Sequence, residues 1–205
     1  DTAQNFNRHY PDMATAVLAD AQSRLGTDAQ ANVATVRQLV GEWLAHWQPA
    51  SELDSLRRQL LLLSHDADLV LDLHCDNDAV MHLYSEEACW TPLEPLARLL
   101  GCQAVLLARE SGGGPFDERL SGLWWQLAAA LRAAGVNAPL PQGCASATVE
   151  LRGEAEVSHE LARKDAHAIQ AFLEHAGAVT AATTTPLPPM ACHPTPLSGS
   201  QTLRT

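Results

Sequence analysis

The stretch Ala67-Asp68-Leu69-Val70-Leu71-Asp72-Leu73-His74-Cys75-Asp76-Asn77 decides the fold that we expect for this chain. Its apolar residues predict a buried strand over 67–73, and His74 stands where that strand should end. In open α/β sheets, ligands and metals gather at the carboxyl ends of the strands. A histidine held there is a candidate metal ligand, because neutral imidazole suits zinc. The alternative is a histidine that finishes a core strand with one hydrogen bond.

Helical and strand-like segments alternate on both sides of this stretch. Helical spacing occurs in 14–25, 33–47, 92–100, 116–134 and 158–175. Gly101 predicts a C-terminal cap for the helix over 92–100, and Ser51 followed by Asp54 predicts the start of a further helix. Further strands are expected at 103–108 and 145–151. This alternation predicts the α/β class, with a parallel or mixed sheet flanked by helices.

The composition changes after residue 176, where Ala, Thr and Pro begin to dominate. We expect either a linker that leads into another domain or an extended tail that lies against the first domain. A chain of 205 residues can hold one substantial domain, or one domain and part of a second.

Charge and hydropathy exclude several classes of partner. The formal net charge of −11 argues against a nucleic-acid backbone, because proteins that bind one usually carry a basic face. No apolar run approaches the roughly 18 residues that a membrane span needs. The sequence also shows no basic leader with an apolar stretch behind it, so we expect a cytoplasmic protein and no membrane partner.

The cysteines are odd in number and include no C-x-x-C pair. The five residues are Cys75, Cys89, Cys102, Cys144 and Cys192. This pattern excludes a ribbon-type zinc site and argues against a disulfide framework, so reduced thiols are expected. Cys75 follows the candidate histidine directly, but neighbours on a strand point to opposite faces. We therefore interpret Cys75 as a packing residue rather than a nucleophile.

Two further segments carry polar groups suited to chemistry. Near the amino terminus, Asn7 and Arg8 stand together in an irregular loop, where a guanidinium and an amide can grip a carboxylate. A solvated loop is the alternative.

Farther on, Glu150 interrupts an apolar strand, which is costly unless the carboxylate is paired or functional. A glutamate beside a metal-bound water can take its proton, whereas a salt-bridged strand glutamate is the alternative. Three consecutive glycines at 112–114 could flank a pocket, but they lack the context of a phosphate-binding loop.

Taken together, Asn7-Arg8, then His74 in an Asp-Leu-His strand end, then Glu150 in Val-Glu-Leu-Arg-Gly, resemble the succinylglutamate desuccinylase/aspartoacylase family. That family belongs to the wider zinc carboxypeptidase-like superfamily. The resemblance runs from about residue 5 to about residue 175. It implies a partial zinc-hydrolase catalytic domain over 1–176, and over 177–205 a linker and the beginning of a carboxy-terminal β-domain.

The resemblance also implies a role for each matched residue. His74 would be a zinc ligand, Asn7 and Arg8 would bind the substrate carboxylate, and Glu150 would act as general base and acid. The implied reaction is hydrolysis of the amide bond of a small N-acyl amino acid, with zinc as cofactor. Asp72 shares a strand face with His74, either as a hydrogen-bond partner of the ring or as a structural residue. His82 is expected to shape the pocket or to pack locally.

The chain departs from the family pattern in one respect. Two of the three expected zinc ligands should come from a His-x-x-Glu motif before Asn7, and no histidine here is followed by Glu at that spacing. We therefore expect an interior piece of a longer deacylase, one that is inactive alone and binds zinc weakly. Missing strands would leave a sheet edge that a second copy can cover, so a homo-oligomer is among the expected partners. The rival functions are a carboxypeptidase and a non-catalytic α/β module that binds carboxylates.

Overall fold

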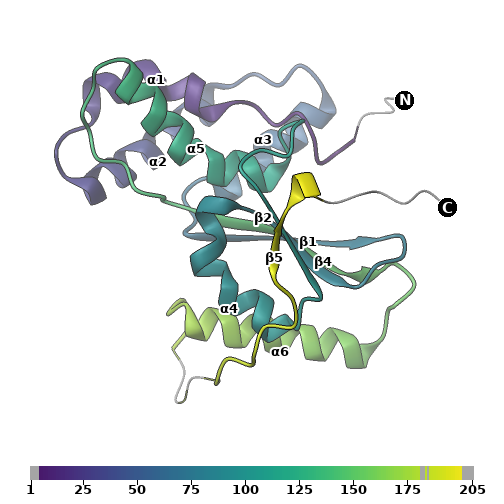
Figure 1. Cartoon of the computed structure of the whole chain (residues 1–205). Helices are drawn as coiled ribbons and strands as arrows, with labels where there is room; N and C mark the ends of the chain where they lie inside the picture. The colour runs from purple at the N-terminus through teal and green to yellow at the C-terminus, as the bar shows by residue number, and fades with distance from the viewer. Residues whose placement is uncertain (1–4, 181–182, 184, 200–205) are drawn as a thin grey trace. The chain divides into compact units, whose positions relative to one another are not determined.

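The computed structural model describes residues 5–180, 183 and 185–199. By compactness the chain divides into two units, each built from two segments. The first unit contains Asp1–Val70 and Glu110–Ser146, and the second contains Leu71–Arg109 and Ala147–Thr205. Figure 1 shows the helices and strands of both. The predicted boundary between 1–176 and 177–205 stays a prediction, and residues 200–205 of its second part lie outside the described residues.

The first unit is helical. It consists of α1 (Met13–Arg24), α2 (Ala29–His46), α3 (Glu52–Ser64) and α5 (Phe116–Ala133). Each of α1, α2 and α3 begins at a side chain that accepts a hydrogen bond from the first turn, and the caps are Asp12, Asp28 and Ser51. The predicted cap is confirmed, since Ser51 Oγ accepts from the amide of Asp54 at 3.0 Å. α1 packs against α2 and α5 around a core that includes Val36, Leu44, Trp124 and Leu127.

The second unit holds most of a mixed sheet. Its strands are β1 (Leu69–Asp76), β2 (Met81–Glu86), β3 (Ala104–Ala108), β4 (Ala145–Gly153) and β5 (Pro194–Pro196), in the order β1-β4-β2-β3-β5. β2 runs antiparallel to β4 and parallel to β3, and β3 runs parallel to β5. The predicted mixed α/β fold is therefore confirmed. The order leaves β1 and β5 as the edge strands.

Helices cover one face of this sheet. α4 (Trp90–Leu100) follows the short η1 (Glu87–Cys89), and α6 (His159–His175) follows β4. The two long helices pack against each other, and Figure 1 shows them on the same side of the strands. α4 ends at Gly101, whose φ of 70° gives the left-handed cap that the sequence predicts. Beyond β5, η2 (Leu197–Gly199) is the last described element.

The strand predicted over 67–73 differs from the observed β1 in position and burial. β1 extends to Asp76, so His74 lies within the strand rather than at its end. The strand is not buried, and Leu73 is 51% exposed. The reason is topological. An apolar run usually marks a central strand covered on both faces, whereas β1 lies at the edge of the sheet.

A second difference concerns β2, a strand that the sequence does not predict. Five of its six residues are buried, which makes it the most enclosed strand of the sheet. Its sequence Met-His-Leu-Tyr-Ser-Glu contains four polar side chains, so it lacks the apolar run by which buried strands are found. Polar residues on this strand must therefore have partners inside the unit.

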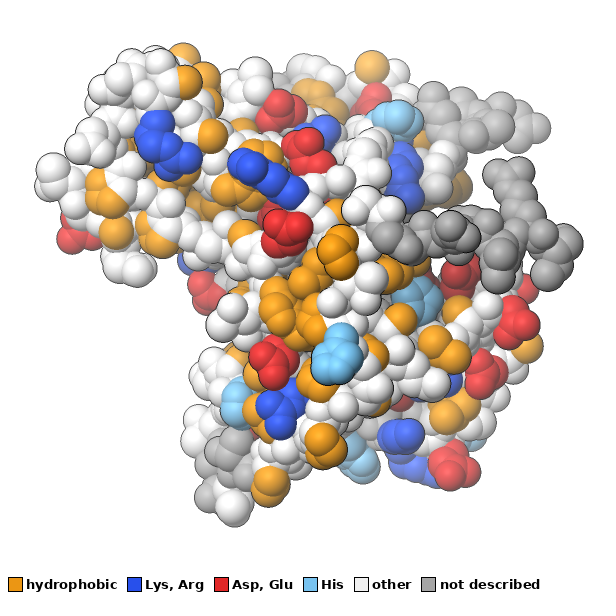
Figure 2. Space-filling view, in the orientation of Figure 1, with side chains coloured by type: hydrophobic (Ala, Val, Ile, Leu, Met, Phe, Trp, Pro, Cys, Tyr) orange, Lys and Arg blue, Asp and Glu red, His pale blue; other side chains and the backbone are white. Residues whose placement is uncertain are grey.

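Charged side chains are dispersed over the face of the molecule that Figure 2 draws. On the face drawn in Figure 2, basic side chains are interspersed with acidic ones. In the described part of the chain, no helix combines the length and the apolar character that crossing a membrane requires. The absence of nucleic-acid and membrane partners stays a prediction, as does the cytoplasmic location.

Candidate functional site

Polar side chains from three adjacent strands face one another in the second unit. Glu150 on β4 is paired directly with His82 on β2, so both side chains lie on the same face of the sheet. The charges of His74 and Asp72 on β1 act on Glu150 as well. The candidate site is this group of four side chains, which we call the His–Glu cluster.

His74 is oriented by the neighbouring carboxylate on its own strand. Its Nε2 lies 2.9 Å from Oδ2 of Asp72, which is the contact expected of residues two apart on a strand. A proton on Nε2 leaves Nδ1 as the ring nitrogen with the lone pair that a metal requires. Carboxylate–histidine pairs of this kind fix the ring in metal sites. The geometry therefore suits a ligand, and the ligand role itself stays a prediction.

Glu150 is held in a poorly solvated position. Its Oε2 is buried and accepts no hydrogen bond from any described residue. Burial raises the pKa of Glu150 above its ordinary value, while the charges of His74 and His82 oppose that rise. A carboxylate whose proton affinity is increased is better suited to accept and return a proton near neutral pH. This environment is compatible with the predicted role of general base, and that role stays a prediction.

His82 and Tyr84 complete the surroundings of this carboxylate. His82 is 7% exposed, and its Nδ1 lies 2.8 Å from the carbonyl oxygen of Val80. Its ring meets that of Tyr84 edge to face, with centroids 5.1 Å apart. Burial raises the pKa of Tyr84, and the charge of Glu150 adds to that rise. His82 therefore packs beside the glutamate, as one of its two predicted roles requires.

Asn7 and Arg8 belong to the first unit, so the structure describes them apart from the His–Glu cluster. Asn7 Oδ1 accepts a hydrogen bond of 2.8 Å from the amide of Phe116, the first residue of α5. Arg8 Nη1 donates to the carbonyl oxygen of Asn7 at 2.6 Å. These bonds fix the loop, which argues against the solvated alternative. Carboxylate binding by the pair stays a prediction.

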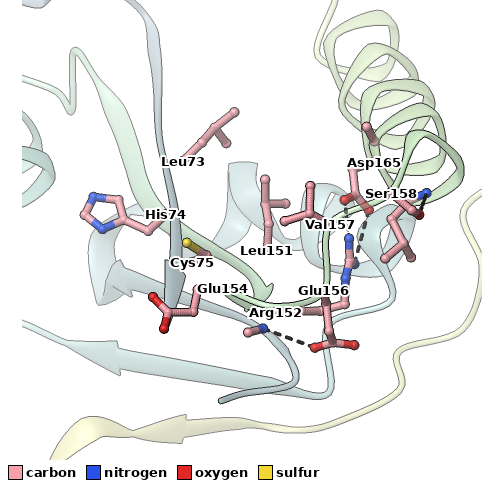
Figure 3. A pocket seen from close by; sticks show the side chains of 13 residues that line it. Leu73, His74, Cys75, Leu151, Arg152, Glu154, Glu156, Val157, Ser158 and Asp165 are labelled. Atoms are coloured by element: carbon pink, nitrogen blue, oxygen red, sulfur yellow. Dashed lines mark hydrogen bonds and ion pairs between the residues drawn. The ribbon is translucent and has the colours of Figure 1, made fainter. Parts of the chain in front are cut away.

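The opposite face of the sheet carries a groove that sequence reasoning missed. Its volume is about 550 Å³, and it is lined by β1, the end of β4 and the first turns of α6. Figure 3 shows the ring of His74 pointing away from Leu151 and Asp165, which border the groove. Arg152 and Asp165 form an ion pair beside it. His74 is itself one of the residues that line the groove, so the groove borders the His–Glu cluster at β1.

A zinc ion fits only part of this arrangement. Within the described residues, no group of three or more His, Cys, Asp or Glu side chains is arranged to hold a metal ion. His74 with its carboxylate partner, next to a desolvated Glu150, fits one ligand and one base of such a site. A complete zinc site would need ligands from beyond the residues that the structure describes.

Comparison with known proteins places this fold in context. No family model and no curated protein matches the chain. Among solved structures, a succinylglutamate desuccinylase/aspartoacylase family protein from Shewanella amazonensis SB2B is 28% identical with a TM-score of 0.77, over 96% of this chain and 53% of that one. A succinylglutamate desuccinylase/aspartoacylase from Shewanella frigidimarina NCIMB 400 is 25% identical with a TM-score of 0.74, over 96% and 52%.

These matches confirm the resemblance that the sequence predicts. The chain has the fold of succinylglutamate desuccinylase/aspartoacylase family proteins across nearly its whole length. It spans about half the length of the solved structures that it matches. The activity, the substrate and the cofactor therefore stay predictions.

Proposed function

We propose that this chain is part of a zinc-dependent deacylase that hydrolyses the amide bond of a small N-acyl amino acid. The observation that carries the proposal is Glu150, whose buried Oε2 has no hydrogen bond in the described structure and whose neighbour is an oriented histidine. The fold shared with two desuccinylase/aspartoacylase proteins supports the same reaction class.

The roles follow from the chemistry of each side chain. His74 would contribute one protein ligand through Nδ1, while Asp72 keeps the ring in place through Nε2. The metal, when bound, supplies a polarised water and a Lewis acid for the amide carbonyl. Glu150 accepts a proton at its buried carboxylate and later gives it to the leaving amine. In the first unit, Arg8 would hold the carboxylate of the amino acid.

The environment of Glu150 supports its role as a shuttle. A carboxylate with a low pKa would keep the proton too briefly to return it, whereas burial raises the pKa of this group. Tyr84 and His82 pack around the glutamate and limit its contact with water. The strand pairing of β2 with β4 fixes the position of the carboxylate, because side chains on strands are held more firmly than those on loops.

An activity screen tests this proposal. The natural polypeptide that contains these 205 residues is supplied with zinc and incubated with N-acetyl and N-succinyl amino acids, and free amino acid is measured by mass spectrometry. Release of the amino acid, abolished by a chelator and restored by zinc, is the expected result. Cleavage of carboxy-terminal residues from peptides instead would favour the carboxypeptidase. Binding of carboxylates without any hydrolysis would favour the binding module.

A further inference from the structure

The two edges of the described sheet differ in how they are protected. β5, at one edge, has three residues, and Pro194 and Pro196 lack the backbone N–H through which another strand could pair. β1, at the other edge, has eight residues and no proline. It also exposes apolar surface, since Leu73 is 51% exposed. Proteins usually cover or blunt an edge of this kind, because its backbone groups are a template for pairing with another chain.

The backbone of β1 faces its neighbour β4 and the open edge in turn. The carbonyl oxygen of Asp76 accepts a hydrogen bond of 2.8 Å from the amide of Glu154, just after β4, so Asp76 faces inward. Because successive residues of a strand alternate in direction, Leu71, Leu73 and Cys75 point their N–H and C=O groups away from β4. The described sheet has no further strand on that side. These three residues therefore offer a row of donors and acceptors for pairing.

Apolar side chains lie beside this edge, in the groove between β1 and α6. Leu73 lines the groove together with Leu151 and Val157, and Figure 3 shows the three side chains. Val157 is 85% exposed. A strand added to β1 places every second side chain on this face, where it removes apolar surface from water. Such a strand gains backbone hydrogen bonds and apolar contact together.

The sequence of β1 suits antiparallel pairing with a second copy of itself. Directly opposite residues of an antiparallel pair share a face, and like charges placed opposite each other are unfavourable. A register centred on Asp72 would oppose two carboxylates, and one centred on His74 would oppose two imidazoles. The register centred on Leu73 instead places Asp72 opposite His74 of the second copy. Registers centred farther toward either end of the strand pair fewer residues.

We propose that the open edge of β1 binds β1 of a second copy, as an antiparallel pair centred on Leu73 that joins the two sheets into one. The two-fold axis of this pair leaves both grooves on the same face of the joined sheet, with the two Leu73 side chains together between them. Each chain carries a net charge of −11, so the two copies repel each other. Salt screens that repulsion, and the dimer therefore tightens as salt is added.

Sedimentation velocity of the 205-residue chain at micromolar concentrations tests the pairing. The wild-type chain should form a dimer. Leu73→Lys should weaken that dimer by about a hundredfold, because the axis brings two ammonium groups together where two leucines met. The matched control is Leu63→Lys, at a leucine of α3 that is 81% exposed and lies outside the sheet, and it should dimerise as wild type. A monomeric wild-type chain, or equal weakening in the two variants, would overturn the inference.

Disulfide trapping with oxidised glutathione tests the register, and it does not depend on the Lys variant. In Leu73→Cys the two introduced thiols face each other across the axis. Exchange with one oxidised glutathione forms one S–S bond between the copies and releases two reduced glutathione molecules. The two native Cys75 thiols lie roughly 13 Å apart along the strands in this register, too far for a bond. Peptide mapping should find the link at position 73 in the variant, whereas a link through Cys75 or none at position 73 would refute the register.

Hydrogen exchange separates a second copy from the other possible occupant of this edge, a segment of the natural polypeptide itself. In the 205-residue chain, the amides of Leu71, Leu73 and Cys75 should become protected as the concentration rises into the range where the dimer forms. The same amides in the natural polypeptide should show the same dependence on concentration. Protection of these amides in a monomeric natural polypeptide would overturn the inference, because its own residues would then cover the edge.

Discussion

The ion pair between Arg152 and Asp165 offers a quantitative test of how the second unit is held together. The two side chains are 13% and 9% exposed, and a second contact joins Nη1 to Oδ1 at 3.3 Å. Arg152 also has a φ of 81°, an unfavourable backbone conformation that the pair must outweigh. Asp165→Asn removes the negative charge while it keeps the shape of the side chain, so the guanidinium is left buried without a counter-charge.

We expect this change to cost about 3 kcal/mol, the lower end for breaking one partner of a buried pair, since the amide oxygen still accepts one bond. Urea unfolding followed by circular dichroism gives the free energy, and hydrogen exchange of α6 amides assigns the loss to the second unit. The matched control is Glu94→Gln, which breaks the more exposed pair with Arg98 and should cost about 0–1 kcal/mol. A loss below about 1 kcal/mol for Asp165→Asn would refute the reasoning, because it would show that solvent already screens the pair.

Three further predictions each compare two residues or two conditions that should give different results. Gly112→Ala should cost about 1–2 kcal/mol in urea unfolding because of its positive φ. Gly113→Ala should cost more, because its new Cβ would also lie 2.9 Å from Cδ of Arg8, and an equal cost for the two variants would contradict that contact. Burial raises the pKa of Glu150 above 4.5, so the folded metal-free protein binds this proton more tightly than the unfolded chain, and the free energy of unfolding falls as the pH rises above 4.5. Glu150→Gln should therefore be more stable than wild type in neutral solution and no more stable than wild type below pH 4.5. A stability difference that does not change with pH would contradict the raised pKa. Alkylation followed by peptide mapping should find the exposed Cys75 modified first and Cys102 protected, because burial raises the pKa of Cys102 to about 12. Equal rates of alkylation would contradict this difference in burial.

Local signals predicted most of the elements of this fold. The cap at Ser51 and the left-handed Gly101 are set by interactions within a few residues, so both could be read from the sequence. The edge position of β1 depends on which strands lie beside it, a property of topology that an apolar run does not contain. β2 was missed for a related reason. Its polar side chains are buried by contacts with other strands rather than by a pattern of their own.

Only part of the candidate site could be predicted from the sequence. The spacing of two residues along a strand predicted that Asp72 could reach His74, and the structure brings them to 2.9 Å. The pairing of His82 with Glu150 joins positions far apart in the chain and depends on the register of β2 against β4.

The proposed role of Glu150 as the base of a zinc-dependent deacylase is tested by the turnover of a single variant. Hydrolysis of N-acyl amino acids is compared between the natural polypeptide and its Glu150→Gln variant, with bound zinc measured in the same samples. The claim predicts turnover reduced by about 10²–10⁴-fold with the zinc content unchanged. The control Glu154→Gln, at an exposed glutamate beyond the end of β4, should behave as wild type. Unchanged turnover in Glu150→Gln would contradict the account.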